Sequence, residues 1–149
     1  MKTMIPTWVY NNKKMEKRED LPPGSIGFTY LITFNEKDDA GRNYSYLGCK
    51  QFISVRGTYS NAWVKYLGSS VNVKDKMASG ELTVKSREML EFAISKQQLA
   101  YMDTREIVCR GLLEDSSSLN MWVKAKLFKA HIMEPKPMKI TPKKVKKKK

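Results

Sequence analysis

Two tyrosines, Tyr30 and Tyr46, are spaced so that their phenols could act together. They fall in two runs rich in aromatic and β-branched residues, 27–34 and 43–52, which a polar, turn-forming stretch separates, so the pattern predicts a β-hairpin. If the loop is centred near Asp38, Tyr30 lies opposite Tyr46, and directly paired residues point to the same face of a sheet. A phenol whose pKa of roughly 10 is lowered by nearby cations can relay protons, so the pair indicates general acid–base chemistry.

Further polar groups lie near the second tyrosine or on one predicted helix. Gly48 comes two residues after Tyr46 and leaves room for a ligand or a backbone to approach the sheet. Residues 97–113 have apolar side chains at helical positions and a glycine near the end, which predicts a helix. Asp103 and Glu106 fall within it, and because residues three apart share a helix face, their carboxylates are expected on one side.

The elements that must position these residues fit into one domain. A chain of 149 residues with 41% hydrophobic side chains can bury one core but not two. Residues 21–24, Leu-Pro-Pro-Gly, mark an entry turn. We predict an N-terminal extension over 1–24, a domain over 25–134 and a tail over 135–149. After the hairpin we expect a short helix followed by a loop around Gly68, a strand over 82–94, the helix over 97–113 and a last strand or short helix over 120–128.

Charge is concentrated at the C-terminus. The chain carries 28 Lys and Arg against 15 Asp and Glu, a net charge of +13, which favours binding to polyanions. Residues 135–149 hold eight lysines and no acid, so the rest of the chain is only mildly basic. The tail has too little apolar surface to fold alone and is predicted to be disordered. Its nucleic-acid-binding candidates are Lys143, Lys144, Lys146 and Lys147.

Several classes of protein are excluded by what the sequence lacks. With Cys49, Cys109 and a single histidine, His131, and with no CxxC motif, we expect neither a zinc site nor a disulfide-linked partner. No segment is apolar enough for a signal peptide or a membrane span. The expected location is a reducing cytoplasm. The sequence sets no oligomeric state.

Taken in order along the chain, these residues resemble the GIY-YIG nuclease superfamily, and within it the phage-encoded homing endonucleases related to the Seg enzymes. The resemblance covers about Ser25 to Phe128. The motifs that carry it are Phe28-Thr29-Tyr30, Tyr46-Leu47-Gly48, Lys50, the string Trp63-Val64-Lys65-Tyr66-Leu67-Gly68-Ser69-Ser70, Arg87-Glu88-Met89-Leu90, Tyr101-Met102-Asp103 and Asn120.

The resemblance implies an α/β fold with a small, three-stranded, mainly antiparallel sheet flanked by helices. It also implies hydrolysis of a DNA phosphodiester with one divalent ion, Mg²⁺ or Mn²⁺, with RNA as the other polymer of the same chemistry. Tyr30 or Tyr46 would activate a water, Lys50 or Arg56 would neutralise charge on the phosphate oxygens, and a helical carboxylate would hold the metal. The site residues implied are Tyr30, Tyr46, Lys50, Arg56 and Asn120 for catalysis, Asp103 or Glu106 for the metal, and Trp63, Tyr66, Ser69 and Ser70 for nucleic-acid binding.

Two other function classes stay open. Asp103 is one methylene shorter than the glutamate usual in the family, which favours as an alternative an inert nucleic-acid-binding protein that keeps the fold. The other alternative is an interaction protein of unrelated fold whose lysine tail docks on an acidic partner. Dependence on a divalent metal separates the nuclease from the binder, and competition by duplex DNA separates the binder from the interaction protein.

Overall fold

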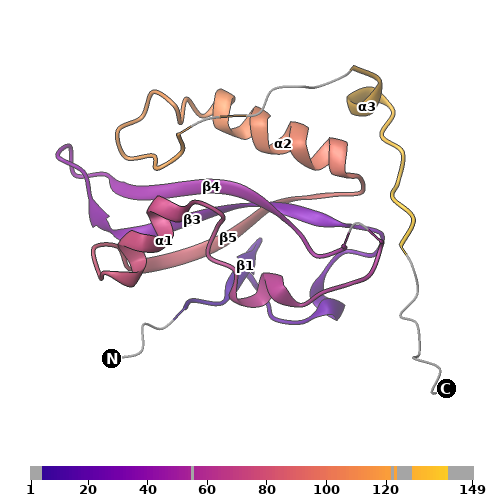
Figure 1. Cartoon of the computed structure of the whole chain (residues 1–149), viewed down its shortest axis with the longest axis horizontal. Coiled ribbons are helices and arrows are strands. Elements are labelled where there is room, and N and C mark those ends of the chain that lie inside the picture. Colours follow the sequence, from indigo (N-terminus) through magenta and orange to yellow (C-terminus); the bar gives the residue numbers. More distant parts are fainter. Residues whose placement is uncertain (1–4, 55, 122, 124–128, 141–149) are drawn as a thin grey trace.

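The computed structural model describes residues 5–54, 56–121, 123 and 129–140. Its centre is a mixed five-stranded sheet with the strand order β2-β1-β5-β3-β4 (Figure 1). The strands are β1 (Trp8–Tyr10), β2 (Lys13–Met15), β3 (Gly27–Lys37), β4 (Asn43–Gln51) and β5 (Val84–Ala93).

Helices cover both faces of this sheet. The long helix α2 lies along one face, whereas α1 and the 3-10 turn η2 lie on the other side (Figure 1). No helix within the described ranges is long and apolar enough to cross a membrane. The helical elements are η1 (Arg18–Asp20), η2 (Ala62–Lys65), α1 (Val71–Ala78), α2 (Lys96–Cys109) and α3 (Lys129–Met133).

Aromatic side chains fill the core on the η2 side of the sheet. Trp8, Phe28, Tyr30 and Trp63 are all fully buried there, and the Trp8 ring meets those of Phe28 and Tyr30 edge-on, with centroids 5.2 and 5.4 Å away. Each such ring buries roughly 150–250 Å² of largely apolar surface, so this cluster dominates the packing. The hairpin that carries the tyrosines is therefore held rigidly.

The sheet has five strands rather than the three expected. The antiparallel β5-β3-β4 part matches the prediction, and the two further strands come from residues 8–15, which the sequence analysis set before the domain. β1 pairs with β5 in parallel, with Trp8 opposite Arg87, and the Trp8 indole N–H donates to the Trp63 carbonyl at 2.7 Å. Strands of three residues are too short to show an alternating pattern, and their partner is distant in sequence.

Arg87 ties the new strand to the loop after η2. Its buried guanidinium donates to the carbonyls of Pro6, Tyr66 and Val64 at 2.7, 2.8 and 2.9 Å. It also lies 4.4 Å from the centre of the Trp8 ring. One cation thus fixes the backbone that carries Tyr66.

The register of the hairpin differs from the prediction. Tyr30 lies opposite Gly48, and Tyr46 lies opposite Ile32. Because the shift is two residues, and residues two apart on a strand share a face, Tyr30 and Tyr46 remain on the same face as diagonal neighbours. The prediction of a shared face is confirmed, and the prediction of a direct pair is wrong.

The cause of the new register is the way the loop closes. The Asp38 carboxylate accepts hydrogen bonds from the amides of Ala40 and Arg42 at 3.0 and 2.9 Å, and the Asp38 N–H donates to the Arg42 carbonyl at 2.8 Å. Asp38 therefore begins the loop instead of occupying its centre, a role that aspartate side chains often take in turns. An irregularity between Thr33 and Lys37 then reduces this offset, because Lys37 lies opposite Asn43 whereas Thr33 lies opposite Ser45.

Most of the other expected elements are present with altered bounds. The strand expected over 82–94 is β5, and the helix expected over 97–113 is α2, which ends before Gly111 adopts a φ of +64°. After β4, the expected single helix and loop are replaced by η2, a loop and then α1, for which Ser70 is the N-cap. Of residues 120–128, only 120, 121 and 123 are described, and they form no regular element.

The first part of the predicted disordered tail is packed. The Met138 N–H donates to the Ile94 carbonyl at 2.9 Å, and Met138 and Ile140 contact the main core. Two apolar side chains at alternating positions are enough to dock this segment along the end of the domain, below α3 (Figure 1). Lys143, Lys144, Lys146 and Lys147 lie outside the described residues.

Candidate active site

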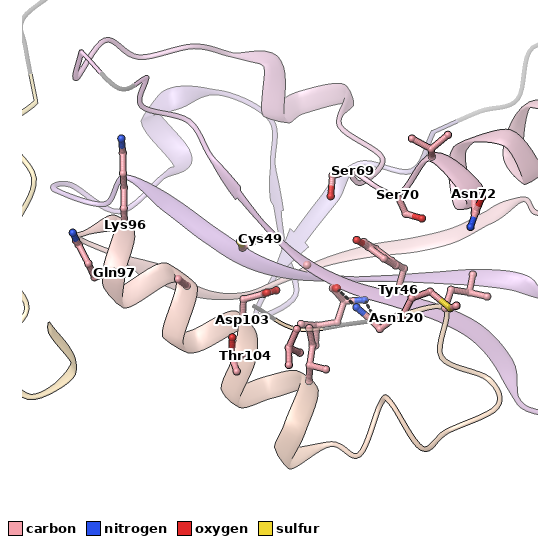
Figure 2. A pocket seen from close by; sticks show the side chains of 18 of the residues that line it. Tyr46, Cys49, Ser69, Ser70, Asn72, Lys96, Gln97, Asp103, Thr104 and Asn120 are labelled. Carbon is pink, nitrogen blue, oxygen red and sulfur yellow. Dashed lines mark hydrogen bonds between the residues drawn. The ribbon is translucent and has the colours of Figure 1, made fainter. Parts of the chain in front are cut away.

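A cavity of about 800 Å³ opens along the outer edge of β4, between α2 and the start of α1 (Figure 2). Its volume is within the range of small-molecule and cofactor sites. Because β4 is an edge strand, side chains from both faces of the sheet reach the same space. The lining residues used below are Tyr46, Gly48, Ser69, Ser70, Asp103 and Asn120.

The two tyrosines have different relations to this cavity. Tyr46 is partly exposed and lines it, whereas Tyr30 is fully buried beneath the loop before α1. Their ring centroids are 6.4 Å apart. Burial raises the pKa of Tyr30 well above its ordinary value, and the phenols of Tyr66 and Tyr46 raise it further. Of the two, Tyr46 is therefore the phenol that a molecule in the cavity would meet.

Gly48 makes room for the Tyr30 ring. A Cβ atom at position 48 would lie 2.5 Å from the Tyr30 hydroxyl oxygen and 2.7 Å from Cζ. We predict that Gly48→Ala lowers the free energy of unfolding by about 1–3 kcal/mol, because the buried ring has no space to move into. Urea denaturation checks this. In a Tyr30→Leu background the cost should shrink, and equal costs in both backgrounds would contradict the proposed clash.

Asp103 reaches the cavity from α2. Its carboxylate faces the space below Ser69 (Figure 2), and its Oδ1 atom is buried without a hydrogen-bond partner among the described residues. Burial raises the pKa of Asp103 to about 6. An incompletely satisfied carboxylate in a cleft is a recognised mark of a functional group.

Glu106 does not join Asp103 in the cavity. The face of α2 that lines the cavity is formed by Ala100, Asp103, Thr104 and Ile107. Successive residues of a helix are rotated by about 100° about its axis, so Glu106 lies roughly 110° from the centre of this face. Its carboxylate instead accepts a hydrogen bond from Arg110 at 2.9 Å, which, with a second contact to Arg105, keeps the pKa of Glu106 below its usual value.

The raised pKa of Asp103 makes stability depend on pH. The folded state holds the proton up to about pH 6, whereas an unfolded chain releases it near its ordinary value of 3.8. The contribution of Asp103 to the free energy of unfolding is therefore largest below pH 3.8, where both states hold the proton, and it falls as the pH rises towards 6. We predict that Asp103→Asn raises the free energy of unfolding at pH 8 by about 1–2 kcal/mol, after allowance for partial exposure. At pH 4 the two proteins should unfold alike, and a pH-independent difference would contradict this account.

Asn120 stabilises the edge of the sheet on which Tyr46 lies. Its side-chain N–H donates to the Leu47 carbonyl at 2.6 Å, and its Oδ1 accepts from the Leu47 N–H at 3.0 Å (Figure 2). The side chain thus pairs with β4 as a neighbouring strand would. Asn120 lines the cavity, but both ends of its amide are engaged in holding the backbone next to Tyr46.

Comparison with known proteins agrees with this geometry. The family model described as "Putative endonuclease segE, GIY-YIG domain" matches residues 8–127, which is most of the chain and begins at the first residue of β1. The chain belongs to the GIY-YIG endonuclease family. The resemblance seen in the tyrosine tripeptides is thereby confirmed, and the family's function class is that of a nuclease acting on nucleic acid. Comparison with curated proteins and with solved structures gave no significant match.

The predicted cations of this GIY-YIG domain lie outside the cavity wall. The Lys50 ammonium is 4.7 Å from the centre of the Tyr66 ring, and that ring packs edge-on against Tyr30 at 5.8 Å. Lys50 therefore packs on the cluster formed by the rings of Tyr30, Tyr46 and Tyr66, called the tyrosine cluster below. Arg56 is in the exposed loop after β4 and does not line the cavity. The cation that does is Lys96, at the start of α2, which the sequence analysis missed.

Of the four predicted nucleic-acid-binding residues within the domain, two line the cavity and two do not. Trp63 is fully buried, and its indole donates to the Tyr59 hydroxyl at 2.9 Å, so it is a core residue. Tyr66 is half-buried in the tyrosine cluster. Ser69 and Ser70 line the cavity beside Tyr46 (Figure 2).

Cys49 is a second cavity residue that the sequence analysis missed. It lies on β4 with its thiol towards α2, and burial raises its pKa to about 12, with a smaller contribution from the Asp103 charge. Strand alternation was the available signal, since residues 47 and 49 face α2 if Tyr46 and Gly48 face the opposite side. A neutral thiol beside Asp103 gives this part of the wall low polarity.

The residues present fit a hard divalent ion held by a single carboxylate. In the described ranges no three His, Cys, Asp or Glu side chains gather as a metal cluster. Mg²⁺ usually keeps several waters and binds through one or two carboxylates together with substrate phosphate. Asp103 lines a cavity of nucleotide dimensions, and its buried Oδ1 has no hydrogen-bond partner among the described residues, so a single carboxylate of this kind fits that requirement.

Proposed function

We propose that this protein is a divalent-metal-dependent DNA endonuclease of the phage homing type. The observation that carries the proposal is that Tyr46 and Asp103, whose Oδ1 has no hydrogen-bond partner among the described residues, line one cavity from the two faces of edge strand β4. A phosphodiester placed there would have a proton-relaying group on one side and an anionic group on the other. The family assignment supplies the reaction class.

In this proposal hydrolysis forms a bond from a water oxygen to phosphorus and breaks the bond from phosphorus to the leaving sugar oxygen. Tyr46 orients the water and relays its proton to solvent, and the leaving sugar oxygen takes up a proton from solvent. Lys96, which lines the cavity, stabilises charge on the phosphate oxygens, whereas Lys50, held over Tyr66 outside the cavity wall, and Arg56 contact the nucleic-acid backbone farther away. Asn120 holds Leu47, and with it Tyr46, in place.

Asp103 would hold Mg²⁺ or Mn²⁺. When bound, the ion supplies positive charge that offsets the negative charge developing on the phosphate and the leaving oxygen. Cys49 and the apolar lining keep the carboxylate partly desolvated, which strengthens its interaction with a cation. The proposed place of action is a reducing cytoplasm, that of the host for a phage gene, in which Cys49 and Cys109 stay free thiols.

A plasmid assay tests the proposal. Supercoiled DNA is incubated with the whole chain in Mg²⁺, in Mn²⁺ and in EDTA, and nicked and linear products are quantified. Cleavage with either ion and none in EDTA is the expected result. DNA binding without cleavage under any metal condition would overturn the nuclease in favour of the inert binder, and lack of binding would overturn both.

The C-terminal tail is proposed to add affinity without reading sequence. Deleting residues 141–149 removes six lysines and leaves the docked Met138 in place. We predict weaker binding to every DNA sequence alike, with the salt slope reduced by about 0.9 for each lysine that contacted a phosphate. The turnover number at saturating DNA should be unchanged. Fluorescence anisotropy between 50 and 200 mM salt measures the slope.

A longer deletion provides the comparison. Removing residues 135–149 also removes Met138 and Ile140 from the core, so this variant should lose stability in addition to affinity. An unchanged salt slope in the shorter deletion would show that the lysines take no part in binding.

A further inference from the structure

Two grooves continue the cavity of Tyr46 and Asp103 along the side of the sheet that carries α1 and η2 (Figure 1). The first, called the α1 groove, has a volume of about 570 Å³ and lies between η2 and α1. Residues 66–68 line it, whereas Ser69 and Ser70 line the cavity, so this loop is the wall between the two spaces. A polymer in the cavity enters the α1 groove by crossing this loop.

The second groove, called the η1 groove, adjoins the first at η2. It has a volume of about 590 Å³ and lies between η1 and η2. Ala62 and Lys65, both in η2, line the two grooves alike, so one groove leads into the other at this turn. The cavity, the α1 groove and the η1 groove therefore follow one another along one side of the domain.

The charges in the two grooves favour an anionic polymer. Among the described residues that line them there are four cations and one acid, which are Lys17, Arg18, Lys65, Lys74 and Glu16. Lys65 comes from η2 and Lys74 from α1, so each wall of the α1 groove contributes one lysine. Both lysines are exposed, and neither forms an ion pair within the described ranges. Their charges are therefore available to a ligand.

The groove on the other side of α1, called the acidic groove, carries the opposite charge. Asp75 and Glu81 line it, and Lys76 is its one cation among the described residues. It also adjoins the cavity, because Ser70 and Asn72 line both spaces. A nucleic-acid strand that leaves the cavity thus meets net positive charge towards the α1 groove and net negative charge behind α1. Electrostatic attraction favours the first direction and repulsion opposes the second.

We propose that the α1 groove and the η1 groove bind the phosphate backbone of DNA on one side of the scissile phosphate, through Lys74, Lys65 and Arg18. This inference rests on the proposed function and adds the direction in which the DNA crosses the protein. Duplex DNA carries one negative charge for about every 1.7 Å of its axis, so cations spread along two grooves contact successive phosphates. Phosphate contacts carry no sequence information, so this surface orients the DNA without selecting its sequence.

Two lysines of α1 provide a matched comparison. Lys74 and Lys76 are both exposed, but a rotation of about 200° separates them, so Lys74 lines the α1 groove and Lys76 lines the acidic groove. Lys74→Gln and Lys76→Gln remove the same charge from the same helix, and lysine and glutamine have similar helix propensities. A double variant, Lys65→Gln with Lys74→Gln, is compared with Lys76→Gln combined with Lys85→Gln, because Lys85 is exposed on β5 and lines none of these grooves.

Binding of the whole chain to a DNA duplex is measured in EDTA between 50 and 200 mM salt, with thermal unfolding recorded for each variant. We expect the slope of log affinity against log salt to fall by about 0.9 in Lys74→Gln and about 1.8 in the Lys65 and Lys74 double variant. The Lys76 variants should keep the wild-type slope. Equal slopes in the two double variants would overturn the proposal.

Two further measurements separate the other outcomes. Weaker binding of fluorescent poly-glutamate by the Lys65 and Lys74 double variant, with DNA affinity unchanged, would assign the grooves to an acidic protein and overturn the proposal. Failure of the proposed function would look different, because the wild type would bind DNA with the expected dependence on Lys74 but would cut no plasmid in any metal. Plasmid cleavage with equal slopes in the two double variants would overturn the grooves alone.

Discussion

Asp103→Asn is expected to lower single-turnover cleavage by about 10³-fold while leaving DNA affinity in EDTA nearly unchanged. The substitution keeps the size of the side chain but removes the charge that would hold the divalent ion, and charge stabilisation by a metal is worth several kcal/mol, with each 1.4 kcal/mol equal to a factor of ten. Rapid-quench kinetics with saturating protein measures the chemical step directly.

Glu106→Gln is the matched control. Glu106 is three residues from Asp103 on the same helix, yet it pairs with Arg110 and does not line the cavity. Its loss should change cleavage by less than about threefold, since exposed ion pairs are worth roughly 0–1 kcal/mol. Equal losses for both substitutions, or a larger one for Glu106, would show that the metal ligand has been assigned to the wrong carboxylate.

Tyr46→Phe is the second substitution with a large expected effect. Removal of one hydroxyl should lower turnover by about 10²–10⁴-fold, the usual contribution of general acid–base catalysis, with little change in the KM for DNA. Tyr10→Phe, in β1 and packed edge-on against Phe92, is the control. A flattened dependence of rate on pH in Tyr46→Phe would distinguish lost proton transfer from lost packing.

The same substitution at Tyr30 is expected to have a different effect on turnover. Tyr30→Phe removes a fully buried hydroxyl that does not line the cavity, so it should lower turnover much less than Tyr46→Phe does. The opposite outcome, with turnover falling more in Tyr30→Phe than in Tyr46→Phe, would place proton transfer on the buried phenol. That result would require the loop before α1 to open when DNA binds.

Local patterns in the sequence were sufficient to predict the hairpin and the long helix. Aromatic and β-branched residues surround Tyr30 and Tyr46, and apolar residues recur at helical positions around Asp103, so both elements were placed within a few residues. The shared face of the tyrosines was predicted from a direct pairing that is wrong, and it is kept because the register differs by two residues, an even number. The family assignment rested on the same residues and is confirmed.

Features that depend on distant contacts could not be predicted in this way. The direct pairing of the tyrosines failed because the Asp38 side chain decides where the loop begins. The short strand at Trp8 exists because β5 offers it a partner about eighty residues later. Three-residue spacing predicts a shared helix face for Asp103 and Glu106, but in the structure Glu106 pairs with Arg110 and does not line the cavity.

The pairing of Asn120 with Leu47 also bears on how the protein avoids self-association. An edge strand normally offers its free amides and carbonyls to another chain, which makes it a template for aggregation. Here residues 117–120 occupy that edge: the Ser45 N–H donates to the Ser117 carbonyl at 2.9 Å, the Leu119 N–H donates to the Ser45 carbonyl at 2.8 Å, and the Asn120 amide continues the pattern at Leu47.

The opposite edge is protected by other means, because β2 has only three residues and two of them are Lys13 and Lys14. Short, lysine-bearing strands are poor templates for a further strand. Asn120 therefore covers the backbone of edge strand β4 at Leu47, beside the cavity that must remain accessible to a polymer. A chain that lost this amide would expose β4 to other copies of itself, and the loss would be seen in the yield of dispersed protein before it was seen in catalysis.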